Sequence, residues 1–83
     1  MQIRFTQHAE EKFYVLMRHG WNISREKVEE TVQNSVVLDH SRRPLVIAQS
    51  SLDERHVLRV VYKQDEGVAV VITFYPGRKS QYE

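Results

Sequence analysis

The stretch that decides the fold is residues 57–75, which read VLRVVYKQDEGVAVVITFY. Two valine-rich runs, from Val57 to Lys63 and from Val68 to Tyr75, flank the polar segment from Gln64 to Gly67. Valine, isoleucine and aromatic residues favour strands, and glycine readily adopts the positive φ that a tight hairpin turn requires. The stretch therefore predicts two antiparallel strands joined by a hairpin.

Alternation along these two strands predicts which side chains face the core. The more apolar row, which we expect to meet the helices, consists of Leu58, Val60, Tyr62, Val68, Val70, Ile72 and Phe74. The opposite row is half polar and consists of Arg59, Val61, Lys63, Ala69, Val71, Thr73 and Tyr75. A sheet face with Arg, Thr and Tyr close together is a candidate surface for ligand binding.

The segments before this hairpin predict two more strands. Val36 to His40 and Leu45 to Ser51 have the period of strands, and Ser41-Arg42-Arg43-Pro44 between them is typical of a turn. Residues 52–54 then connect to the strand that begins at Val57. The C-terminal half is accordingly predicted to be a four-stranded antiparallel meander.

The N-terminal half predicts one strand and two helices. Gln2 to Thr6 alternates like a short strand, and apolar residues recur at helical spacing from Gln7 to His19, with Gly20 as the cap. Ser24 is a good N-cap for a second helix that ends at about Asn34, so a helical hairpin is expected. The predicted fold class is α+β, with the helices covering one face of the sheet in a two-layer sandwich.

Composition narrows the class of protein. The 83 residues form one domain, 1–83, with a net charge of +1 that by itself favours no strong nucleic-acid binding. The chain has no cysteine and no Gly-rich nucleotide motif, and its four histidines lack zinc-site spacing, so we expect no metal and no cofactor. The sequence lacks a signal peptide and a transmembrane pattern, which predicts a cytoplasmic protein with no membrane partner.

The C-terminal tail combines aromatic and cationic side chains in the way a phosphate-and-base contact surface requires. Tyr75, Arg78 and Tyr82 lie in or after the last strand, and Arg59 is expected on the neighbouring strand beside Tyr75. Guanidinium groups bind phosphate oxygens in a fork, and tyrosine rings stack on unpaired bases. The alternative is that Tyr75 shields an open sheet face and the tail charges are solvated.

Two histidines are candidates for proton transfer. His8 lies at the start of the first helix, where the macrodipole favours a neutral imidazole, and His56 begins the strand that carries Arg59. Strand alternation turns His56 inward with Leu58, so a partly buried histidine with one hydrogen bond is an equally good interpretation.

Four short motifs together resemble a known family. They are FTQHA at 5–9, RHGWNIS at 18–24, LRVVY at 58–62 and VITFYP at 71–76. These segments are similar to the FTxHA, RxGxxIS, LRVVY and VxTxYP motifs of a small uncharacterised bacterial and archaeal family, domain of unknown function 4258. That family is grouped with the RelE, ParE and BrnT toxins of toxin-antitoxin systems.

The resemblance implies a RelE-like fold and a toxin that cleaves messenger RNA without a metal. In that chemistry the 2′-hydroxyl attacks the adjacent phosphate while cationic groups stabilise the charge and a side chain moves the proton. The catalytic candidates are His8, Arg59 and Tyr75, with His56 added from its chemistry alone; the substrate-binding candidates are Arg18, Thr73, Arg78 and Tyr82. The implied partners are an antitoxin protein and RNA.

Active ribonucleases of this class are usually strongly basic, whereas this chain is nearly neutral. The ParE-like members of the same group act on a topoisomerase and not on RNA. Two alternatives therefore stay open: a binding module without catalysis, whose open sheet face or strand edge accepts a protein, and a homodimer formed through the same face.

Overall fold

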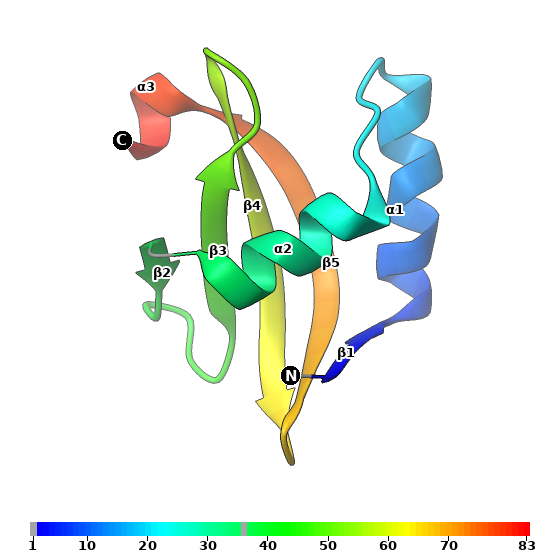
Figure 1. The fold of residues 1–83 in the computed structure, drawn as a ribbon, viewed down its shortest axis with the longest axis vertical. Helices are drawn as coiled ribbons and strands as arrows, with labels where there is room; N and C mark the ends of the chain where they lie inside the picture. The colour runs from blue at the N-terminus through cyan, green and yellow to red at the C-terminus, as the bar shows by residue number, and fades with distance from the viewer. Residues whose placement is uncertain (1, 36) are drawn as a thin grey trace.

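A computed structural model describes residues 2–35 and 37–83 as a five-stranded mixed sheet with three helices (Figure 1). The elements in chain order are β1 (Gln2–Phe5), α1 (Gln7–Arg18), α2 (Arg25–Asn34), β2 (Val37–Asp39), β3 (Val46–Ser51), β4 (His56–Asp65), β5 (Val68–Arg78) and α3 (Lys79–Tyr82). The predicted α+β class is confirmed. Val36, the first residue of one predicted strand, lies outside the described residues.

The strand order in the sheet is β1-β5-β4-β3-β2. Neighbours from β2 to β5 pair antiparallel, whereas β1 pairs parallel with β5, Phe5 lying opposite Val71. Between these two strands the chain runs along the sheet as α1, crosses it as α2, and returns through β2, β3 and β4 to β5. The sequence pattern predicts the strand at Gln2 but does not indicate its neighbour.

Local signals in the sequence set the helix ends. The Thr6 hydroxyl accepts a hydrogen bond from the Ala9 backbone N–H, and the Ser24 hydroxyl accepts one from Lys27, so both residues cap a helix N-terminus. Gly20 follows α1 at φ +88°, a left-handed conformation that glycine adopts without steric cost. The two helices do not form an antiparallel hairpin, because α2 runs across the sheet while α1 runs along it (Figure 1).

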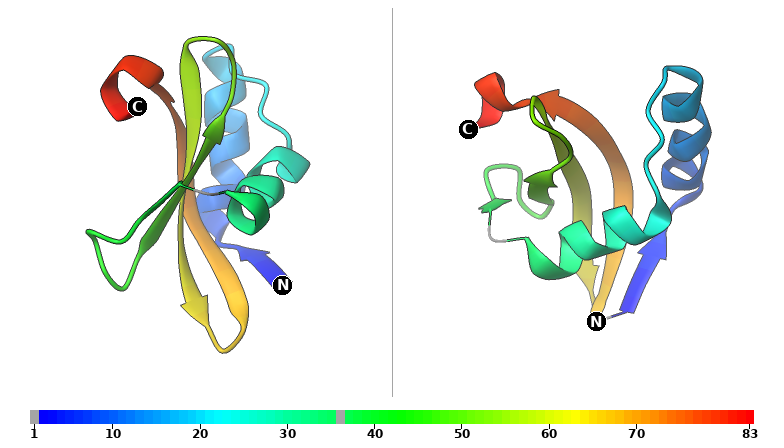
Figure 2. Two further views of the ribbon diagram at one scale, coloured as in Figure 1. Left: turned by 60° about the vertical axis from the view of Figure 1, so that its left-hand side comes forward. Right: turned by 45° about the horizontal axis from the view of Figure 1, so that its top comes forward.

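Both long helices cover the same face of the sheet, and α3 lies on the opposite side (Figure 2). The core between the helices and the sheet is a single cluster of apolar side chains: Ala9, Leu16, Ile23, Val28, Val32, Ala48, Leu58, Val60, Tyr62, Ala69, Val71 and Phe74. The Phe13 ring of α1 lies 4.6 Å from the Phe74 ring, centroid to centroid, which ties the helix to β5.

A β-bulge in β5 changes the predicted faces. Tyr62 pairs with Val71 and Val61 pairs with Thr73, so Ile72 is an extra residue that the partner strand does not match. Before the bulge, Ala69 and Val71 face the helices, so the prediction that Val68, Val70 and Ile72 do so is wrong. Beyond the bulge Phe74 packs in the core as predicted, as do Leu58, Val60 and Tyr62 of β4, and the outward positions of Arg59, Thr73 and Tyr75 keep their predicted parity.

The chain continues beyond the predicted end of the last strand. The strand β5 extends to Arg78, opposite His56 at the start of β4, and the short helix α3 then turns over the sheet face that α1 and α2 leave open (Figure 2). The polar face predicted to bind a ligand is therefore partly covered by the chain's own tail.

Candidate functional site

Arg59 lies on the open sheet face beside Tyr75, as the alternation of the strands predicts, and the two residues are directly paired. The Arg59 Nε–H donates to the Tyr75 hydroxyl at 3.2 Å, and a second guanidinium N–H donates to Gln49 Oε1 at 2.6 Å. A third contact reaches an Asp39 carboxylate oxygen at 3.4 Å. The guanidinium thus contacts side chains from three strands.

The tail covers this guanidinium. The Tyr82 ring of α3 lies over Arg59 with its centroid 4.1 Å from the guanidinium carbon, a cation–π geometry. As a result only 7% of Arg59 is exposed. A cation whose three nitrogens each contact a neighbouring side chain, with an aromatic ring on its face, is placed to hold the sheet and tail together.

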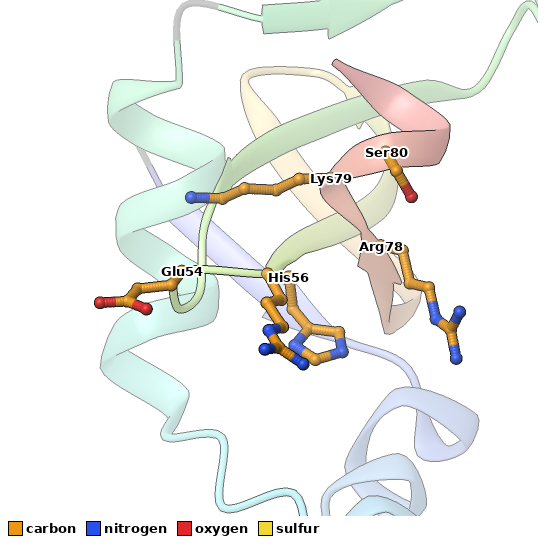
Figure 3. Close-up of a pocket in the computed structure, with 6 residues that line it drawn as sticks. Glu54, His56, Arg78, Lys79 and Ser80 are labelled. Atoms are coloured by element: carbon orange, nitrogen blue, oxygen red, sulfur yellow. The ribbon is translucent and has the colours of Figure 1, made fainter.

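A second cluster lies at the end of the sheet where β4 begins and β5 ends. Its side chains line a hollow of about 500 Å³: Glu54, Arg55, His56, Arg78, Lys79 and Ser80. His56 and Arg78 are direct cross-strand partners, which places two predicted site residues together. In Figure 3, Lys79 and Glu54 extend to one side of His56 and Arg78 to the other, so that the imidazole lies between charged groups.

The His56 ring is held by contacts on two sides. Its Nδ1 lies 2.9 Å from Asp53 Oδ1, and its ring packs edge to face against Trp21 with a centroid separation of 4.8 Å. Because an ionised carboxylate accepts a hydrogen bond, Nδ1 carries the proton in the neutral ring, and Nε2 keeps a lone pair. An imidazole oriented in this way can exchange a proton through Nε2.

Asp53 is itself fixed by the loop that leads into β4. Its Oδ1 accepts the backbone N–H groups of Arg55 and His56, both at 2.8 Å. The hydrogen bond from Arg55, followed by that from the His56 side chain, holds the pKa of the Asp53 carboxyl below its usual value. The carboxylate form is therefore the one that orients His56.

The hollow has a positive charge balance although the chain is nearly neutral. Arg55, Arg78 and Lys79 contribute three positive charges against one negative charge from Glu54, which leaves +2 with His56 neutral. Asp53 behind the imidazole reduces this balance to +1. Net cationic groups around an oriented imidazole suit an anionic ligand such as a phosphodiester.

Other predicted residues lie elsewhere. His8 is exposed in the first turn of α1, and this helix starts beside Val71 of β5. His56 lies opposite Arg78, which is seven residues further along β5 than Val71. At about 3.3 Å per residue this separation is on the order of 20 Å, so His8 and His56 do not act on one phosphate. Arg18 is exposed at the end of α1, and Thr73 lies on the open face opposite Val61.

Several residues of this site were not singled out by the sequence patterns. Asp53 and Trp21 position His56, and Lys79 belongs to the wall of the hollow. The Asp53-x-x-His56 spacing was a usable signal, because an aspartate at a turn often bonds to backbone and side chains two or three residues later. Trp21 offers no such local signal, since its contact with His56 joins the connection between α1 and α2 to the start of β4.

In residues 2–35 and 37–83, no group of three or more His, Cys, Asp or Glu side chains is arranged to hold a metal ion. Over the same residues, none of the helices combines the length and the apolar character needed to cross a bilayer.

Comparison with known proteins adds no relative: no family model, curated protein or solved structure matches the chain.

Proposed function

We propose that this protein is a toxin-like ribonuclease that cleaves RNA without a metal, and that its active site is the hollow between the start of β4 and the end of β5. The observation that carries the proposal is the Asp53-oriented imidazole of His56 among the cations Arg55, Arg78 and Lys79. An oriented base beside several cations meets the two main requirements of RNA transphosphorylation, which are proton transfer and stabilisation of phosphate charge.

The proposed reaction uses the RNA's own nucleophile. His56 Nε2 takes the proton from a 2′-hydroxyl as that oxygen forms a bond to the adjacent phosphorus, and the bond from phosphorus to the 5′-oxygen breaks. The proton then passes from the imidazolium to the leaving 5′-oxygen, which gives a 2′,3′-cyclic phosphate and a 5′-hydroxyl. The nearby guanidinium and ammonium groups stabilise the negative charge that builds on the phosphate oxygens.

In this proposed site the candidate residues have different roles from those that the family resemblance implies. His56 becomes the group that transfers the proton, and Arg78 with Lys79 binds the phosphate. Arg59 and Tyr75 become structural because their polar groups bond to each other under the tail. The implied antitoxin remains the expected partner, and the RNA would approach the sheet end rather than the sheet face.

Cleavage of RNA in the presence of a chelator tests the proposal. Purified protein with excess EDTA should shorten a single-stranded RNA, and His56→Gln should reduce the rate about 10²-fold or more, in line with the loss of general acid–base catalysis. Asp53→Asn keeps the size of the side chain but removes its charge, and should lower the rate without abolishing it. His40→Gln, an exposed histidine outside the hollow, is the matched control.

Two outcomes would contradict this assignment. RNA that stays intact after prolonged incubation with folded wild-type protein would remove the catalytic proposal. A large loss of activity in His8→Gln, with His56→Gln fully active, would place the chemistry at the other end of the sheet. Far-ultraviolet circular dichroism of every variant separates lost chemistry from lost folding.

A second candidate function is protein binding through the edge strand β2. This strand ends the sheet order among the described residues, and its Val37 and Leu38 side chains are 49% and 44% exposed. An exposed edge with apolar side chains can accept a strand from another protein, such as a segment of an antitoxin. Co-purification with an antitoxin encoded by a neighbouring reading frame would support this function. Leu38→Lys, which places a charge on the exposed edge, should abolish the co-purification, whereas Lys63→Ala, on β4, should not.

A further inference from the structure

The hollow has two walls, and they are attached to the fold in different ways. One wall, from Glu54 to His56, belongs to the loop and strand held by Asp53. The other wall, from Arg78 to Ser80, belongs to the end of β5 and the first turn of α3. Arg78 is held by its pairing with His56, whereas the positions of Lys79 and Ser80 depend on what holds α3 against the sheet.

The short helix α3 is attached to the sheet both through its backbone and through a side chain. The Lys79 backbone N–H donates to the Arg55 carbonyl at 2.9 Å, which joins the two walls at one point. A second attachment is the Tyr82 ring, which lies on the Arg59 guanidinium at a centroid distance of 4.1 Å. Arg59 is a firm support, because it is buried and donates to Gln49 and Tyr75.

Gly77 is what allows the ring to lie there. A Cβ atom at this position would be 2.5 Å from Tyr82 Cε2 and 2.9 Å from its Cδ2, closer than carbon atoms approach. Since the ring is the end of a side chain that can rotate, a larger residue at 77 would displace Tyr82 rather than break the strand. Gly77 and Tyr82 thus form one packing unit, with Arg59 beneath the ring.

We propose that Tyr82 is a positioning residue for phosphate binding: stacked on Arg59 above Gly77, it holds α3 so that Lys79 lines the hollow that His56 and Arg78 also line. This inference rests on the proposed function, because it concerns the same hollow. It assigns the ligand class as the phosphodiester backbone of a single-stranded nucleic acid. Tyr82 itself does not contact the ligand.

A binding experiment separates this inference from the catalytic proposal. The probe is a fluorescein-labelled ten-nucleotide oligodeoxythymidylate, which has phosphodiesters but no 2′-hydroxyl and so cannot be cleaved by the proposed route. Fluorescence anisotropy at low salt should show binding by the wild-type protein that weakens as salt is added. Lys79→Ala should weaken binding about fivefold, as expected for the loss of one partly solvated cationic contact.

Tyr82→Ala should weaken binding by a similar factor although no charge is lost, and Tyr82→Phe, which keeps the stacked ring, should bind like wild type. Gly77→Ala should resemble Tyr82→Ala because it displaces the same ring. The double variant Gly77→Ala/Tyr82→Ala should bind no more weakly than Tyr82→Ala, since the second change removes the side chain that the first one strikes.

Measurements are made at a temperature at which circular dichroism shows each variant folded, and Gly77→Ala provides the test if Tyr82→Ala does not fold. Wild-type affinity in both Tyr82→Ala and Gly77→Ala would overturn the inference and leave Tyr82 with a structural role only. Failure of the wild-type protein to bind the oligonucleotide would overturn it as well. Binding with these variant effects but without RNA cleavage would uphold the inference and reject the catalytic proposal.

Discussion

Replacement of Arg59 by alanine should lower the stability of the fold, because Arg59 joins the sheet and the tail and is not the group that transfers the proton. The substitution removes the donor from Gln49 Oε1, a buried acceptor on a residue that is only 5% exposed. Leaving a buried polar atom unpaired costs about 1–3 kcal/mol. It also removes the stack under Tyr82, worth about 1 kcal/mol.

Two further contributions to the free energy of unfolding of Arg59→Ala have opposite signs and nearly cancel. The contact from Arg59 to Asp39 is long, at 3.4 Å, and partly solvated, so its loss costs at most about 1 kcal/mol. Removal of a buried cation regains some desolvation free energy. We therefore expect Arg59→Ala to lower the free energy of unfolding by about 3 kcal/mol.

Thermal unfolding followed by circular dichroism measures this change. For a domain of this size, about 3 kcal/mol corresponds to a fall in Tm of ~15 °C. Arg55→Ala, an exposed arginine on the loop before β4, is the matched control and should change stability by no more than about 0.5 kcal/mol. A fall of less than about 4 °C in Arg59→Ala, combined with complete loss of RNA cleavage by folded protein, would refute the structural role and return Arg59 to the catalytic group.

Two other predictions concern turns and acid stability. The pKa of Asp53 lies below its unfolded value, so its carboxylate stabilises the fold above about pH 4, and this contribution is lost as the pH falls through the folded pKa. The difference in Tm between wild type and Asp53→Asn should therefore become smaller from pH 6 to pH 3. A difference that grows over this range would contradict the role given to Asp53. Glu66 adopts φ +50° in the two-residue turn that it forms with Gly67. Because asparagine accepts this conformation more readily, Glu66→Asn should raise the free energy of unfolding by up to about 1 kcal/mol in urea titrations, whereas a loss would show that the Glu66 side chain makes a stabilising contact.

Local chemistry explains what the sequence predicts well. The ends of α1 and α2 follow from Thr6, Gly20 and Ser24, because a capping hydroxyl or a left-handed glycine acts within a few residues. The hairpin at Gly67 follows for the same reason. These features need no knowledge of the rest of the fold.

The faces of β5 could not be predicted because its first half is apolar at nearly every position. Val68, Ala69, Val70 and Val71 fit the core in either register, so alternation does not choose between them. The turn decides instead: pairing of Asp65 with Val68 places Val71 opposite Tyr62. The bulge then restores the expected faces from Thr73 onward, and no residue type at Ile72 signals it.

The candidate site was predicted only in its separate parts. His56 and Arg78 each have suitable chemistry, but their pairing depends on the register beyond the bulge. The sequence could not predict how exposed Arg59 is, because its exposure depends on the tail that covers it. The helix in that tail has four residues and is too short to show a periodic pattern. Long-range packing, rather than local propensity, decides which of the predicted residues can meet a ligand.

Ile72, the extra residue of the bulge in β5, helps to anchor the start of α1 away from the hollow. The backbone carbonyl of Ile72 accepts a hydrogen bond from the Thr6 hydroxyl, the same group that caps α1, while the Val71 carbonyl accepts the Thr6 N–H. Deleting one residue here would leave a regular ladder with every later side chain on its present face, but it would remove the acceptor that anchors the first helix. Natural variation in strand length at this point should therefore be accompanied by a change at position 6.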